Sequence, residues 1–136
     1  MEKSFYIDQL HINTFETRGE MANNAALTAG AQIISLLKVK PYLNIIFAAA
    51  PSQDEFLKAL IEYPGIDWQS INAFHMDEYI GLPEDAPQSF GNYLNERVFS
   101  RVPFRSVHFI RGNAKDPESE ARRYELELKA FPPDIV

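Results

Sequence analysis

Apolar residues recur along this chain in two periods, which predict strands and helices in turn. The runs YLNIIFAAA at 42–50 and SINAFHM at 70–76 are short and almost continuously apolar, as expected for strands covered on both faces. Other segments space their apolar residues three and four apart, which is typical of one helical face. We predict strands at 10–15, 42–50, 70–76 and 106–110, helices at 17–38, 52–63, 89–99 and 117–131, and the start of a strand at 134–136.

Three of the predicted helices carry recognisable start signals. Thr17 is expected to cap the first helix, with Glu20 three residues later as its capping-box partner. Ser52 is the expected N-cap of the second, where acidic residues follow in the first turn. Pro117 stands at the first turn of the last helix, a position that proline favours.

The alternation of strands with longer helices predicts the fold class. It indicates βαβ units, a mainly parallel Rossmann-like sheet and a three-layer α/β/α sandwich. No linker divides the chain, so we expect one domain over residues 1–136. Because Asp134–Val136 opens a strand that does not continue, we expect the N-terminal portion of a longer protein, truncated at its C-terminal side. The apolar surface left uncovered predicts association into homo-oligomers.

Composition limits the class of protein. The 136 residues are 46% hydrophobic and carry a net charge of −6 with no basic cluster, which argues against a nucleic-acid partner. Cysteine is absent, which excludes disulfides and thiolate metal sites. No stretch approaches the roughly 20 apolar residues of a membrane span. We therefore expect a cytoplasmic protein without a membrane partner.

The turn AAAPSQDE, which follows the strand at 42–50, could bind an anion. In open α/β sheets, ligands bind beyond the carboxyl ends of the strands. Backbone N–H groups at a helix start attract a phosphate, and the Ser52 hydroxyl can add a hydrogen bond. The same serine could serve only as a helix cap, so both roles remain open on this turn alone.

The segment MDEYIG, which follows the strand at 70–76, carries the more unusual chemistry. Asp77 and Glu78 are adjacent, so in an extended backbone they point to opposite sides and do not share one proton. We expect one acid to face the crevice as a general base and the other to be tied into structure. A solvated turn with helix-capping acids is the alternative. His75 and Asp77 could share a strand face, but no third ligand is evident, so no metal site is predicted.

The segment FHMDEYIGLPEDAPQSFGNYLNERVF resembles the glucosamine-6-phosphate deaminase/isomerase family. The family's MDEY.GLP pattern is present at Met76–Pro83, and its P.S before an aromatic helix at Pro87–Phe90. The order of elements from Leu10 to Val136 is also similar. The resemblance implies a phosphorylated amino sugar as substrate, no cofactor, and interconversion of an aldose and a ketose phosphate with release of ammonia. It implies that Asp77 is the base that moves a proton between C1 and C2, that Glu78 accompanies it, and that Ser52 helps to hold the phosphate.

Two departures from the family pattern affect these expectations. The family's phosphate turn usually reads Gly-Gly-Thr, whereas this chain has Ala50-Pro51-Ser52, and proline supplies no N–H. The substrate could therefore be glucosamine 6-phosphate or a relative such as galactosamine 6-phosphate. The family's catalytic Asp-Gly-His segment should follow DIV, so we expect the 136-residue chain not to turn over by itself.

Two other functions remain open. Related domains bind sugar phosphates as sensors in transcriptional regulators, but a sensor does not need the base that Asp77 would supply. 6-Phosphogluconolactonase shares the fold and acts as a hydrolase, although the sequence motif HMDEYIGLP favours the deaminase.

Overall fold

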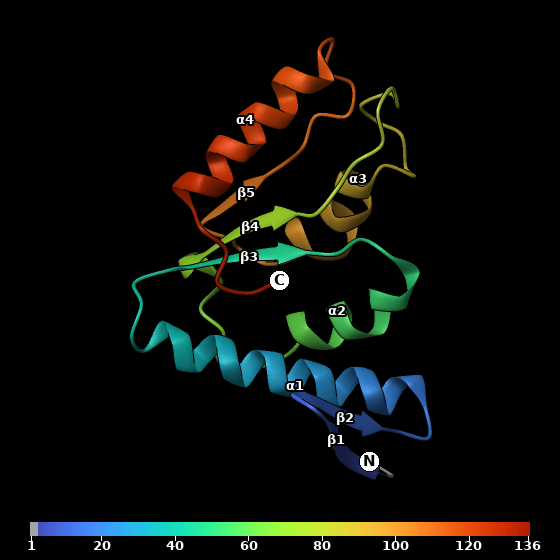
Figure 1. The fold of residues 1–136 in the computed structure, drawn as a ribbon, viewed down its shortest axis with the longest axis vertical. Coiled ribbons are helices and arrows are strands. Elements are labelled where there is room, and N and C mark those ends of the chain that lie inside the picture. Colours follow the sequence, from blue (N-terminus) through green and yellow to red (C-terminus); the bar gives the residue numbers. More distant parts are fainter. Residues whose placement is uncertain (1–2) are drawn as a thin grey trace.

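The computed structural model describes residues 3–136, in which a parallel sheet lies between helices (Figure 1). The sheet has the order β3 (Leu43–Phe47), β4 (Ile71–His75), β5 (Ser106–His108). All its pairings are parallel; β3 pairs with β4 in the register Leu43↔Ile71. The parallel sheet predicted from the two apolar strands is therefore confirmed, with β3 and β4 somewhat shorter than their apolar runs.

Helices cover both faces of this sheet. Figure 1 shows α4 (Pro117–Ala130) on one face and α1 (Arg18–Leu37) with α2 (Asp54–Ile61) on the other. In the sequence, α3 (Phe90–Leu94) comes between β4 and β5, and it continues into a π-helical turn at Asn95–Phe99. The arrangement confirms the predicted α/β class with helices on both sides. Among residues 3–136, no helix is both long and apolar enough to cross a bilayer.

The core lies where the sheet meets its helices. All five residues of β4 are buried, as expected for a central strand with both faces covered. The side chains buried most completely include Phe74, Ile33, Leu43, Leu57, Ile71, Leu94 and Val98. This packing fixes the carboxyl ends of β3 and β4, from which the candidate site residues extend.

The N-terminal residues form an element that the sequence analysis missed. Strand β1 (Lys3–Ile7) pairs antiparallel with β2 (Leu10–Thr14) in a separate hairpin, so the strand expected at 10–15 is not part of the main sheet. Asp8 takes a positive φ of 52° in the two-residue turn, a conformation that aspartate tolerates. Figure 1 shows the hairpin on the side of α1 that faces away from the sheet.

The expected helix starts are only partly confirmed. Thr17 caps α1, since its hydroxyl accepts a hydrogen bond from the Glu20 N–H. The prediction that Ser52 caps the second helix is wrong. Pro51–Gln53 form a short 3₁₀ turn first, so α2 begins at Asp54 and the Ser52 side chain accepts no capping bond. Proline at the start of this turn accounts for the shift, because its fixed φ initiates helical backbone early.

The last residues reach the open edge of β3. Ile135 forms a parallel bridge with Ile45, and the Ile46 N–H donates to the Ile135 carbonyl at 3.0 Å. The predicted strand at 134–136 is thus represented by one parallel bridge. The Asp134 carboxylate accepts a hydrogen bond from the Asn44 N–H at 2.9 Å and also pairs with Lys40, which anchors this segment.

Candidate functional site

The carboxyl end of β4 places two adjacent acids in different environments. Asp77 is exposed, and no side-chain hydrogen bond or ion pair found within residues 3–136 involves its carboxylate. Glu78 is partly buried and hydrogen-bonded. The two adjacent carboxylates thus have different surroundings, one exposed and one held by hydrogen bonds.

Three backbone N–H groups hold the Glu78 carboxylate. Its Oε1 accepts hydrogen bonds from Tyr79 at 2.9 Å and from Phe90 at 3.0 Å, and its Oε2 accepts one from Gly91 at 2.9 Å. Burial by itself raises the pKa of Glu78, but the N–H donors of Gly91, Phe90 and Tyr79 outweigh it, so the pKa lies below its usual value. Glu78 is thus an ionised group that fastens its loop to the start of α3.

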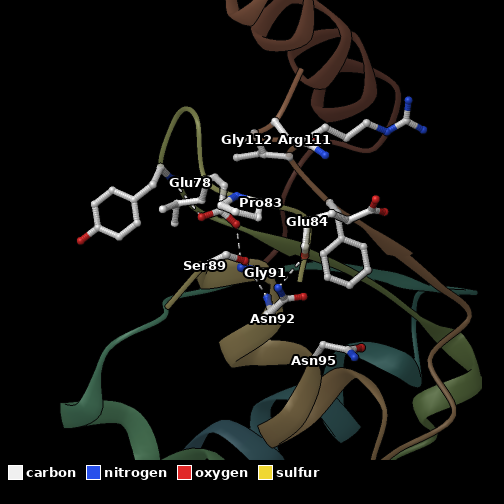
Figure 2. Close-up of a pocket in the computed structure, with 14 residues that line it drawn as sticks. Glu78, Pro83, Glu84, Ser89, Gly91, Asn92, Asn95, Arg111 and Gly112 are labelled. Atoms are coloured by element: carbon white, nitrogen blue, oxygen red, sulfur yellow. Dashed lines mark hydrogen bonds between the residues drawn. The ribbon is translucent and has the colours of Figure 1, made fainter. Parts of the chain in front are cut away.

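Glu78 also forms part of the wall of a cavity of about 380 Å³. Figure 2 shows this cavity between the loop after β4, the start of α3 and the segment after β5. Neither Asp77 nor Ser52 lines it. The residues that line it are Glu78, Tyr79, Leu82, Pro83, Glu84, Ser89, Gly91, Asn92, Asn95, Phe109, Ile110, Arg111, Gly112 and Asn113. The structure therefore separates the two acids, and only Glu78 belongs to the cavity.

Direct backbone contacts join the two loops that flank the cavity. The Gly81 N–H donates to the Gly112 carbonyl at 2.8 Å. At Gly112 a Cβ would lie 2.1 Å from the Tyr79 carbonyl oxygen, so no larger residue fits without backbone movement. Gly81 has a φ of +88°, a left-handed conformation that favours glycine. These two glycines let the loops approach closely enough to bond.

His75 is buried beneath this junction. The Ile110 N–H donates to His75 Nε2 at 2.8 Å, and the Tyr124 hydroxyl donates to the His75 carbonyl at 2.7 Å. Burial lowers the pKa of His75, although the carboxylates of Glu78 and Asp77 act in the opposite direction. Burial also raises the pKa of Tyr124 to about 12. His75 is therefore a neutral structural group, and residues 3–136 contain no cluster of three metal-ligating side chains.

Ser52 lies at the same edge of the sheet as Asp77, because β3 and β4 are parallel and both end there. Ser52 is exposed, and its hydroxyl is free of hydrogen bonds to the described residues. The preceding Ala50 carbonyl accepts hydrogen bonds from Gln53 N–H at 2.8 Å and Tyr93 Oη at 2.9 Å. These hydrogen bonds to the Ala50 carbonyl fix the backbone of the turn, while the Ser52 hydroxyl remains free to bind a ligand.

Comparison with known proteins identifies the family. The family described as "Glucosamine-6-phosphate isomerases/6-phosphogluconolactonase" matches residues 16–136. The chain belongs to this family. It is 35% identical over 88 residues to glucosamine-6-phosphate deaminase of Streptococcus sanguinis, covering 65% of this chain and 37% of that protein. With the deaminase of Proteus mirabilis it is 37% identical over 79 residues, covering 54% and 30%.

Solved structures of the family agree with the fold. A monomeric glucosamine-6-phosphate deaminase superposes with a TM-score of 0.74 at 28% identity, over 88% of this chain and 50% of that one. The 6-phosphogluconolactonase of Thermotoga maritima gives a TM-score of 0.71 at 24% identity, over 80% and 50%, which shows the shared fold. The chain spans about half or less of the length of these relatives.

These comparisons confirm the resemblance to the deaminase/isomerase family. The cavity, however, is lined by residues that the sequence analysis did not identify. Asn95 comes from the π-helical turn, whereas Phe109 and Arg111 come from the segment after β5. These residues lie in separate parts of the sequence, with no local pattern to connect them. The one available signal was that the carboxyl ends of parallel strands converge at one edge of the sheet.

Proposed function

We propose that this chain supplies the proton-transfer carboxylate and part of the phosphate site of an amino-sugar phosphate isomerase/deaminase. The reaction converts glucosamine 6-phosphate into fructose 6-phosphate and ammonia, or a close relative such as galactosamine 6-phosphate into its own ketose 6-phosphate and ammonia. The family membership and the names of the similar deaminases support this proposal. We assign the base to Asp77, the positioning of its loop to Glu78, and the phosphate contact to Ser52.

The different environments of the two acids carry the proposal. A general base needs a carboxylate that is free to accept a proton, and Asp77 has no competing partner within residues 3–136. Glu78 is unsuited to that task because three N–H groups already occupy its oxygens. Buried β4 and the fixed Glu78 hold the backbone on either side of Asp77. The side chain of Asp77 is thereby presented from a rigid base.

The proposed chemistry is a proton transfer along the open-chain sugar. The Asp77 carboxylate removes the proton from C2 of the amino aldose, and the electron pair shifts to form an enolamine. Return of the proton to C1 gives the 2-imine of fructose 6-phosphate. Water then hydrolyses this imine to the ketone and ammonia, so atoms and charge balance without oxidation or reduction. We therefore propose that no cofactor is required.

Ser52 is proposed to hold the phosphate at the neighbouring turn. Its exposed hydroxyl lies at the edge of the sheet where Asp77 is found, in the short 3₁₀ turn that precedes α2. The helix dipole favours an anion there, although Pro51 contributes no N–H. Binding at this turn would direct the sugar carbons toward the end of β4.

Hydrogen exchange at C1 of fructose 6-phosphate tests the proposal. This ketose has an open-chain form in solution, so exchange needs the base but no protein group that opens the ring. In D₂O, the 136-residue chain should accelerate incorporation of deuterium at C1, as followed by proton NMR. Asp77→Asn should slow this exchange about 10²- to 10⁴-fold, the usual effect of losing a general base. Asp85→Asn, an exposed acid in the following loop, serves as the matched control.

Deuterium exchange, together with assays of sugar-phosphate binding and lactone hydrolysis, separates the remaining alternatives. A sugar-phosphate sensor would bind fructose 6-phosphate without accelerating exchange. A 6-phosphogluconolactonase, the activity that the family description also names, would hydrolyse 6-phosphogluconolactone instead. Acceleration that persists unchanged in Asp77→Asn would remove Asp77 from the mechanism.

We further propose that the protein is cytoplasmic and forms homo-oligomers. Several large apolar side chains of the hairpin are exposed, with Tyr6, Ile7 and Leu10 at 69%, 57% and 63%. Exposed apolar patches of this kind favour association. Sedimentation of the wild-type chain and of Ile7→Lys would reveal whether the hairpin mediates it.

A further inference from the structure

The cavity next to Glu78 lies at the same edge of the sheet as Asp77 and Ser52, but neither residue lines it. It has a volume of about 380 Å³, within the range of small-molecule sites. Its floor is the start of α3, and its sides are the two loops joined by Gly81 and Gly112 (Figure 2). The cavity therefore has fixed walls and a polar lining that the proposed proton transfer does not use.

Three asparagines supply the unused polar groups. Among the described residues, the side-chain amides of Asn95 and Asn113 have no hydrogen-bond partner. Asn92 donates its Nδ2 protons to the carbonyls of Glu84 and Ala86, at 2.8 and 2.9 Å, which leaves its Oδ1 free to accept. An amide offers both donors and an acceptor. Such groups match a ligand whose hydroxyls also donate and accept.

An aromatic wall completes the lining. Phe109 is 37% exposed, although its ring packs edge-on against Phe99 and His75 at centroid distances of 5.6 and 5.8 Å. Its position is therefore fixed while one side remains uncovered. Aromatic faces in polar pockets pack against the apolar C–H faces of sugar rings, which adds contact area without requiring further hydrogen bonds.

The charges in the lining argue against a phosphorylated ligand. The carboxylates of Glu78 and Glu84 outnumber the one guanidinium, that of Arg111. Although Glu78 is stabilised by three N–H groups, it remains ionised. A phosphate dianion beside two carboxylates would be repelled, whereas a neutral or ammonium-bearing ring would not. The cavity thus differs in charge preference from the turn at Ser52.

We propose that this cavity binds an unphosphorylated, polyhydroxylated ring of monosaccharide size, neutral or carrying one amino group. The amides of Asn95 and Asn113 and the Asn92 oxygen hydrogen-bond its hydroxyls, and Phe109 packs against its C–H face. Glu78 in its lining is the neighbour of Asp77 in the sequence, but Asp77 itself does not line the cavity. It does not depend on the proposed enzymatic function.

Titration of the ¹⁵N-labelled 136-residue chain with D-glucosamine tests this site by NMR. The expected result is a saturable shift of the side-chain amide signals of Asn95 and Asn113 and of the Gly112 backbone signal, with a Kd in the millimolar range. Inorganic phosphate should leave these signals unmoved. Asn95→Ala should weaken binding about 3- to 10-fold, the effect of one lost neutral hydrogen bond. The exposed Asn23 in α1 provides the matched control, Asn23→Ala, which should bind as the wild type does.

Two further variants keep this test independent of the proposed enzyme. Asp77→Asn and Ser52→Ala should bind D-glucosamine as tightly as the wild type, even if both lose deuterium exchange or phosphate binding. Shifts confined to the residues around Ser52 and Asp77 would overturn the cavity site and leave the enzymatic proposal intact. Absence of any saturable shift, or equal affinity of Asn95→Ala and Asn23→Ala, would also overturn it.

Discussion

The imidazole Nε2 of His75 accepts a 2.8 Å hydrogen bond from the backbone N–H of Ile110. This bond joins the carboxyl end of β4 to the segment after β5, and thus connects the elements on both sides of the cavity. Since Nε2 accepts, the neutral ring carries its proton on Nδ1, which is buried without a hydrogen-bond partner among the described residues. The neutral form of His75 is therefore the one that this packing requires.

Replacement of His75 by phenylalanine should destabilise the fold. The ring volume is roughly kept, but the buried Ile110 N–H loses its acceptor, which typically costs about 1–3 kcal/mol in the free energy of unfolding. Urea unfolding of His75→Phe and the wild type measures this difference. The exposed His11 in the hairpin is the control, and His11→Phe should change stability by less than about 0.5 kcal/mol. Equal effects of the two substitutions would contradict the role assigned to His75.

The neutral state of His75 also predicts a pH dependence. Burial holds its pKa in the folded state below the ordinary value of 6.5. Below pH 6.5 the unfolded chain therefore binds a proton that the folded chain does not, so the stabilisation present above 6.5 is lost as pH falls toward the folded-state pKa. The free energy of unfolding should decrease as pH falls below 6.5 in the wild type, and less steeply in His75→Phe. Parallel curves would disprove this assignment.

The junction of the two loops makes a steric prediction at Gly112. In Gly112→Ala the new Cβ would lie 2.1 Å from the Tyr79 carbonyl oxygen, so the backbone must move and the bond between Gly81 and Gly112 should break. We expect a loss of about 1–3 kcal/mol in stability. Gly19→Ala in the first turn of α1 is the control, since nothing lies within 4 Å of its Cβ position and alanine is the better helix former. Thermal unfolding of both variants should therefore shift in opposite directions.

The sequence predicted those features that depend on local chemistry. Thr17 with Glu20 marked the start of α1, and the apolar runs marked the parallel strands β3 and β4. The hairpin was missed because its turn, Asp8–Gln9, lacks the glycine that usually signals a two-residue loop. The cap assigned to Ser52 was wrong because Pro51 starts a 3₁₀ turn before α2.

The candidate site could be predicted only in part, because it depends on contacts between residues that are distant in the sequence. The pattern MDEY placed two acids at the end of a strand, and alternation of side chains predicted different surroundings for them. Glu78 is the acid that is held by hydrogen bonds, because the N–H groups of Phe90 and Gly91 donate to it from twelve and thirteen residues further along the chain. The cavity depends on the meeting of the loops after β4 and β5. Neither contact has a periodic pattern in the sequence.

The adjacent acids therefore make the sharpest prediction, because their substitutions should have opposite consequences. Glu78→Gln exchanges one carboxylate oxygen for an NH₂ group that faces backbone N–H donors, so it should destabilise the fold by about 1–2 kcal/mol. Asp77→Asn disturbs no hydrogen bond of the described residues, so stability should stay within about 0.5 kcal/mol of the wild type.

The pKa of Glu78 adds a pH signature to the same comparison. Because its pKa is lowered in the folded state, the stabilisation it provides is present above its ordinary value of 4.5 and is lost as pH falls below that value. Urea unfolding at pH 7 and in the acidic range, together with deuterium exchange at C1 of fructose 6-phosphate, measures both properties on each variant. Asp77→Asn should lose exchange and keep its stability. Glu78→Gln should lose stability, including its acid dependence, and retain exchange under conditions where it is folded. If the two variants behave alike in both assays, the division between a catalytic and a structural carboxylate at the end of β4 is wrong.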